Sequence, residues 1–182
     1  LWFASSDRIV CSRESGPSLR REAVWLPADG SGTPKPLFDP LPDIVSVQAT
    51  AISRDGRFVA LADDGKLGRD DIVVYDRELG VATPFLTSRF DEAWPMFSPD
   101  GRWLAYSSNE TGRYEVYVRR FPEGDSKHLL STHGGRGPIW SPDGNEIVFT
   151  TQDLAGLAQY ELRRRRADRA GAEETLFTGK TA

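Results

Sequence analysis

The feature that most constrains the fold is a four-residue turn that occurs three times, each time between two apolar runs. The copies are Ser53-Arg54-Asp55-Gly56, Ser98-Pro99-Asp100-Gly101 and Ser141-Pro142-Asp143-Gly144. Serine suits the first position of a type I turn, and proline presets the backbone at the second. Aspartate can bond its local backbone at the third position, and glycine accepts the left-handed exit. Each copy therefore predicts a β-hairpin.

The turns recur with a period, since their aspartates are 45 and 43 residues apart. A period of this length is typical of four-stranded propeller blades. Two further landmarks keep the same spacing. A third strand is expected 15 or 16 residues after each aspartate, starting at Asp71, Glu115 and Gln159. The end of a fourth strand is expected at Phe85-Leu86-Thr87, Leu129-Leu130-Ser131 and Leu176-Phe177-Thr178.

The segments that follow the turns are continuously apolar, as in Phe58-Val59-Ala60-Leu61 and Trp103-Leu104-Ala105-Tyr106. A continuous apolar run predicts a strand that is covered on both faces. A radial array of blades requires this, because each blade packs between two neighbours. No stretch has helical periodicity of useful length, so we predict an all-β propeller of four-stranded antiparallel blades.

Projecting the period backward predicts an eroded first unit, with Asp7 in the place of the turn aspartate and a third strand near Glu22. We expect one propeller fragment over residues 1–182, with about four blades that form an open arc of a larger ring. The first residue is Leu1 rather than methionine, which fits a fragment. The expected blades are approximately 1–40, 48–87, 94–131 and 138–178.

Composition and charge narrow the classes of partner. The formal net charge is −4 and 38% of residues are hydrophobic. A mildly acidic chain has no electrostatic attraction to nucleic acid or to an anionic membrane. No apolar run approaches the roughly 20 residues that a membrane-spanning helix needs, so direct membrane insertion is not expected. Cys11 is the single cysteine and excludes an internal disulfide.

The third and fourth units resemble the TolB-like propeller repeat, which runs Trp-Ser-Pro-Asp-Gly, an apolar strand, a loop, a third strand and Leu-Thr. The segment Phe97–Val118 is most similar to propellers attached to bacterial serine/threonine kinases. The resemblance weakens over residues 1–40, where the turn motif is degenerate. It implies a bacterial protein-binding propeller, with a periplasmic or extracytoplasmic location favoured. The motif specifies a fold more strongly than a function.

Motifs of catalysis are absent from the sequence. It has two histidines, and it contains no Gly-x-Ser-x-Gly elbow, phosphate loop, paired cysteine ligands or His-Glu-x-x-His motif. We therefore expect no enzymatic activity, no cofactor and no metal site.

Residues 63–71 carry four aspartates and are expected to form a solvated loop, with a weak ion site as the alternative. Arg163–Arg166 are expected at the end of a third strand, running into a solvated turn in which they pair with nearby acids, with phosphate binding as the alternative.

The most informative segments are the connections from each fourth strand to the next first strand, which lie beside the central channel of a propeller. The three connections span residues 41–48, 88–94 and 132–138. These loops carry positive and negative side chains next to aromatic residues, which suits ligand binding. For each charged residue the alternative is a contact within its own loop. The candidate ligand-binding residues are Arg89, Asp91, Glu92, His133 and Arg136.

Two functional hypotheses follow from these features. The first is a non-catalytic propeller module that binds a protein, a peptide or a small ligand, as the sensor or interaction domain of a larger TolB-like or kinase-linked protein. Its other partners would be the remaining blades or domains of the parent chain. The alternative is the gating propeller of a prolyl-oligopeptidase-like serine hydrolase, whose catalytic domain would carry the Gly-x-Ser-x-Gly motif.

Overall fold

The computed structural model describes residues 7–15, 20–39, 46–65, 69–152, 159–166 and 174–180. The chain divides into two compact units, Leu1–Glu92 and Ala93–Ala182. The described residues form strands, turns and bends, and no helix among them could cross a membrane. The all-β prediction is therefore confirmed for the described part of the chain.

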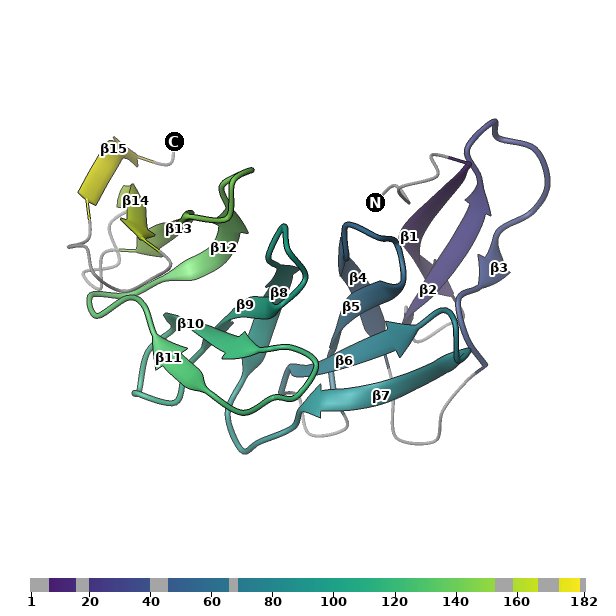
Figure 1. Ribbon diagram of the computed structural model, residues 1–182, viewed down its shortest axis with the longest axis horizontal. Coiled ribbons are helices and arrows are strands. Elements are labelled where there is room, and N and C mark those ends of the chain that lie inside the picture. Colours follow the sequence, from purple (N-terminus) through teal and green to yellow (C-terminus); the bar gives the residue numbers. More distant parts are fainter. Residues whose placement is uncertain are drawn as a thin grey trace. The chain divides into compact units, whose positions relative to one another are not determined.

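The first unit holds two sheets, whose strands follow one another in chain order (Figure 1). The first sheet has the order β1-β2-β3 and the second the order β4-β5-β6-β7, with all neighbours antiparallel. The strands of the first sheet are β1 (Arg8–Ser15), β2 (Arg20–Pro27) and β3 (Lys35–Pro36). Those of the second are β4 (Val47–Ile52), β5 (Phe58–Asp63), β6 (Asp71–Asp76) and β7 (Val81–Leu86).

The second unit repeats the arrangement with two four-stranded antiparallel sheets, ordered β8-β9-β10-β11 and β12-β13-β14-β15. The first sheet has β8 (Glu92–Phe97), β9 (Trp103–Ser108), β10 (Glu115–Arg120) and β11 (Lys127–Leu129). The second has β12 (Arg136–Trp140), β13 (Glu146–Gln152), β14 (Gln159–Arg166) and β15 (Glu174–Lys180). Strands β6, β10 and β14 begin at the three positions where the period predicts a third strand. Blade boundaries, the blade number of the parent ring and the open arc stay predictions.

The strands that follow the turns are covered on both faces. Every residue of β5 after Phe58 is buried, and so is every residue of β9 after Trp103. In the first unit the core joins both sheets, since Val10 and Ala23 lie in the same apolar cluster as Val59. In the second unit, β9, β10 and β13 contribute buried residues to one cluster. Burial between neighbouring sheets, rather than local propensity, is the main stabilising term for such strands.

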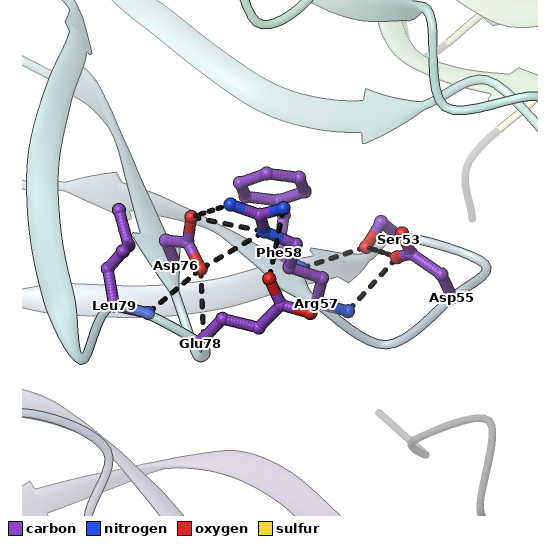
Figure 2. Close-up of polar contacts among 7 residues, drawn as sticks. All are labelled: Ser53, Asp55, Arg57, Phe58, Asp76, Glu78 and Leu79. Atoms are coloured by element: carbon purple, nitrogen blue, oxygen red, sulfur yellow. Dashed lines mark hydrogen bonds and ion pairs between the residues drawn. The ribbon is translucent and has the colours of Figure 1, made fainter.

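The three turns share one set of hydrogen bonds. In the first, the Ser53 hydroxyl donates to the Asp55 carboxylate over 2.5 Å and accepts from the Phe58 N–H over 2.8 Å (Figure 2). The Asp55 carboxylate also accepts from the Arg57 N–H over 3.0 Å. The same three bonds recur around Ser98 and Asp100 and around Ser141 and Asp143.

This bonding pattern favours ionised turn aspartates. The hydroxyl of Ser53 and the N–H of Arg57 hold the pKa of Asp55 below its usual value. The hydroxyl of Ser141, with the backbone and side chain of Asn145, lowers the pKa of Asp143 to about 2. Hydrogen bonds to a carboxylate stabilise its charged form. The turn aspartates are thus structural groups that satisfy local donors.

The turn glycines carry a further testable consequence, since Gly101 and Gly144 have φ angles of 70° and 74°. Replacing either with valine is expected to lower the free energy of unfolding by about 1 kcal/mol or more, because a β-branched residue is strained at positive φ. A Cβ at Gly101 would meet no atom within 4 Å, so the loss of unfolding free energy there would come from backbone strain rather than from a steric clash. Thermal and denaturant midpoints equal to those of the parent would contradict the assignment.

Candidate functional site

The predicted ligand-binding residues lie in two different units. Arg89, Asp91 and Glu92 belong to the first unit, whereas His133 and Arg136 belong to the second. Arg89 is exposed, and its guanidinium carbon lies 4.9 Å from the centre of the Phe90 ring. The expectation that all five act at one site therefore stays a prediction.

Glu92 has a local structural role. Its side chain is buried, with 4% of the residue exposed, and its carboxylate accepts a hydrogen bond from the Ser88 hydroxyl over 2.6 Å. The Ser88 hydroxyl in turn accepts from the Phe90 N–H over 3.0 Å. Asp91 is half-buried. These contacts favour the alternative that Glu92 shapes its own loop.

In the second unit, Arg136 is placed against two aromatic side chains. Its guanidinium carbon lies 4.2 Å from the centre of the Tyr114 ring and 5.7 Å from that of the Trp94 ring. The two rings are 5.5 Å apart and tilted by 59°. We call Trp94, Tyr114 and Arg136 the aromatic–arginine cluster. Among the described residues, no ion pair joins a carboxylate to Arg136, and the contacts of its guanidinium with the two π faces are favourable cation–π interactions.

Trp94 has an unusual backbone. Its φ angle is 54°, the one positive φ of a non-glycine residue in the described part of the chain. A bulky side chain at positive φ is rare and costs free energy, and such strain often occurs at binding sites. The residue is 40% exposed, a large fraction for tryptophan. The strand β8 thus presents an indole ring at the surface in a conformation that local propensity disfavours.

The buried carboxylate of Glu115 holds the loop that carries His133 and Arg136. With 2% of the residue exposed, it accepts hydrogen bonds from the Ser131 hydroxyl and from the Gly134 N–H, the latter over 3.0 Å. The Arg113 guanidinium also forms an ion pair with this carboxylate, at 2.7 Å. A buried carboxylate needs such partners to offset its desolvation. Glu115 therefore anchors the segment 131–134 to the start of β10.

The loop that carries His133 and Arg136 is also held by a close contact between backbone segments at Gly135. The Gly135 N–H donates to the Tyr114 carbonyl over 2.8 Å. A Cβ at this position would lie 2.5 Å from Ser131 Oγ and 2.8 Å from Val116 Cγ2, both in buried residues. Only glycine fits there. Because Gly135 precedes Arg136 directly, this contact also positions the arginine beside Tyr114.

A shallow pocket of about 350 Å³ lies beside the start of the loop, at Thr132. It is lined by Thr111, Gly112, Arg113, Glu115, Leu129 and Thr132. Arg113 donates to the Thr132 carbonyl as well as pairing with Glu115. The side chain of His133 is exposed and its Nδ1 lies 3.1 Å from Thr132 Oγ1. The loop thus carries an exposed imidazole and a half-buried arginine, and the aromatic rings beside the arginine come from Trp94 and Tyr114.

The acidic segment in the first unit differs from the solvated loop that its composition predicts. Asp63 is buried and accepts from the Ser46 N–H, and Asp64 pairs with Arg21 of β2 over 2.8 Å. Burial raises the pKa of Asp71, with the charge of Asp63 as a second cause. The described residues contain no group of three or more side chains suited to a metal ion. Asp64 thus links the two sheets of its unit, and residues 66–68 of the segment lie outside the described residues.

The arginine run lies at the end of a strand. Arg163–Arg166 all belong to β14 and pair in register with Glu146–Phe149 of β13. Extended backbone places successive residues on opposite faces of a sheet. The expected place of the run at the end of a third strand is therefore confirmed, since β14 ends at Arg166. The turn that follows lies outside the described residues.

Comparison with known proteins agrees with the sheet architecture, although no family model matches the chain. A structure from Agrobacterium tumefaciens described as TolB superposes with a TM-score of 0.84, at 24% identity, over 98% of this chain and 64% of that one. TolB from Acinetobacter baumannii gives a TM-score of 0.72 at 17% identity, over 96% of this chain and 42% of that one. The fold is that of a TolB-like β-propeller.

Three curated relatives illustrate the range of proteins that the chain resembles. Uncharacterized protein Atu1656 of Agrobacterium fabrum is 28% identical over 155 residues, 83% of this chain and 47% of the relative. The Tol-Pal system protein TolB of Anaeromyxobacter dehalogenans is 30% identical over 86 residues, 47% of this chain and 20% of the relative. An uncharacterized peptidase of Bacillus subtilis, YuxL, is 29% identical over 119 residues, 62% of this chain and 18% of the relative. The chain spans about half or less of the length of these relatives.

Proposed function

We propose that the chain is a non-catalytic propeller module that binds a protein or peptide partner at the aromatic–arginine cluster. The observation that carries the proposal is Trp94, an exposed indole held at positive φ beside Tyr114 and Arg136. Exposed tryptophan, tyrosine and arginine are the residues most enriched at the energetic centres of protein interfaces. A strained, exposed tryptophan is hard to explain by the stability of the module alone.

The chemistry of the cluster also indicates the partner. The rings supply flat apolar surface, and the Arg136 guanidinium retains donors for an acceptor of the partner. An extended segment with an apolar side chain next to a carboxylate fits both features. The TolB relatives carry the name of the Tol-Pal system, and this favours a protein partner in the periplasm. A kinase-linked parent chain remains a prediction.

A panel of random peptides displayed on phage tests the proposal. We expect selection on the chain to enrich peptides with an acidic residue near an apolar one. Trp94→Ala or Arg136→Glu should weaken binding of a selected synthetic peptide by about tenfold or more, the scale of a loss at an interface centre. Arg89→Glu tests whether the first unit contributes to the same site.

The matched control is replacement of Arg163, Arg164, Arg165 and Arg166 with alanine, which removes positive charge from β14 and leaves the loop segments 88–94 and 132–138 unchanged. These variants should bind the peptide almost as tightly as the parent. The reverse ranking, with the arginine run required and the cluster dispensable, would place the site on β14 and overturn the proposal.

A second function is favoured by the peptidase relative. YuxL matches 62% of the chain, and a structure of prolyl endopeptidases superposes with a TM-score of 0.68 at 18% identity, over 95% of this chain and 28% of that one. In this reading the propeller would gate a serine hydrolase. The complete gene decides between the two, because only the second requires a further domain with a Gly-x-Ser-x-Gly motif.

A further inference from the structure

The shallow pocket beside Thr132 in the second unit has no part in the function proposed above. It has a volume of about 350 Å³ and shares no lining residue with the aromatic–arginine cluster. Its lining comes from the segment before β10, the start of β10, the end of β11 and the loop that follows: Thr111, Gly112, Arg113, Glu115, Leu129 and Thr132. We propose that this pocket binds an uncharged aliphatic side chain of a peptide together with its neighbouring peptide carbonyl.

The first argument is that the charges of the pocket are already balanced. Arg113 and Glu115 are the charged residues of the lining, and their side chains form an ion pair at 2.7 Å. Glu110 and Lys127, which precede Thr111 and Leu129 in the chain, form an ion pair of their own at 2.6 Å. An anionic ligand would therefore meet an arginine that is already neutralised and would be repelled by Glu115.

A cationic ligand finds little carboxylate surface, because both oxygens of Glu115 are engaged. Oε1 accepts from Arg113 Nε over 2.7 Å, and Oε2 accepts from the Ser131 hydroxyl. The Gly134 N–H lies within 3.1 Å of both oxygens, and Glu115 is buried. The pocket therefore favours an uncharged ligand.

The second argument is a guanidinium that is held in place and retains donors. Arg113 donates from Nε to Glu115 and from Nη2 to the Thr132 carbonyl. Neither bond uses the N–H groups of Nη1, which can donate to a ligand. Because two bonds fix the planar group, less entropy is lost when it binds an acceptor. A peptide carbonyl is an uncharged acceptor that suits these donors.

The third argument is an apolar wall of suitable size. Leu129 is 39% exposed at the end of β11, the edge strand of its sheet, so its side chain has surface left to bury. Burying an aliphatic side chain of the ligand against it is favourable through the hydrophobic effect. Ligand pockets occupy about 300–1,000 Å³. This pocket lies at the lower end of that range and suits a short peptide group rather than a large cofactor.

The experiment is an NMR titration of the whole chain with N-acetyl-leucine amide, followed at the backbone amide signals of Gly112 and Thr132. We expect a saturable shift. N-acetylglycine amide lacks the aliphatic side chain, and N-acetyl-leucine carries a carboxylate, so each should bind about tenfold more weakly. Leu129→Ser removes the apolar wall, and Arg113→Lys keeps the positive charge without the Nη donors. Each variant should also weaken binding about tenfold.

Leu79→Ser is the matched control, because Leu79 is exposed in the first unit and lies outside the pocket; it should leave the affinity unchanged. If Arg113→Lys disturbs the bonds of Glu115, Leu129→Ser still carries the test. The titration needs no peptide selected on the aromatic–arginine cluster, so its outcome does not depend on the function proposed above. A shift that does not saturate, N-acetyl-leucine binding as tightly as its amide, an equal loss in Leu79→Ser, or shifts at the Trp94 indole N–H without shifts at Gly112 and Thr132 would overturn the proposal.

Discussion

Replacing Glu115 with alanine is expected to lower the free energy of unfolding of the second unit by about 3 kcal/mol. The carboxylate is buried and serves three donors, on Arg113, Ser131 and Gly134. Its removal leaves the fully buried Ser131 hydroxyl and a backbone N–H without this acceptor. Arg113 is partly exposed and can turn to water, which keeps the loss below that of a fully buried pair.

Denaturant unfolding followed by tryptophan fluorescence measures this effect. The control is Glu123→Ala, because Glu123 forms a long, exposed pair with Arg120 at 3.8 Å and should change stability by less than about 0.5 kcal/mol. Glu115→Gln retains a hydrogen-bond acceptor without the charge, so its loss of unfolding free energy should lie between those of Glu115→Ala and Glu123→Ala. A parent-like midpoint for Glu115→Ala would show that the loop 131–134 does not depend on this carboxylate.

The second large effect is expected at Gly135, where alanine should cost about 2 kcal/mol through overpacking. The added Cβ would overlap Ser131 Oγ and Val116 Cγ2, both in buried residues. Gly135 does not have a positive φ, so its requirement is for space rather than for backbone freedom. Because Ser131 also bonds Glu115, the same substitution should displace the loop and weaken peptide binding at Arg136.

A double-mutant cycle isolates the steric cause of this loss. Val116→Ala removes one of the three atoms that the new Cβ would meet. Gly135→Ala should therefore cost less in the Val116→Ala background than in the parent. Gly112→Ala serves as the control, since Gly112 has a φ of 90° and open space around it, and its loss should not change in that background. Additive losses for Gly135 and Val116 would contradict direct overlap.

The candidate site could be predicted only in part. The position of the loops within the repeat selected Arg136 and His133 as candidates, because the period places the connection between two blades at residues 132–138. Their role in binding stays a prediction. Tyr114 was missed, since it precedes β10 and reaches Arg136 only through the pairing of the Gly135 N–H with its carbonyl. Glu115 marked the start of a strand in the repeat, yet its burial and its bonds to Ser131 and Gly134 depend on chain segments 16 to 19 residues away.

The sequence by itself determined the hairpins and the strand starts. The bonds among Ser53, Asp55 and Phe58 span five residues, and their recurrence in two more copies needs no distant contact. Only the tertiary structure decided which polar groups are buried and what they face. Arg21 meets Asp64 across two sheets, and a small pocket lined by Arg8 and Arg77 forms where those sheets meet. Turn chemistry is local and readable from neighbours in the chain, whereas burial and charge pairing arise when sheets pack and water leaves between them.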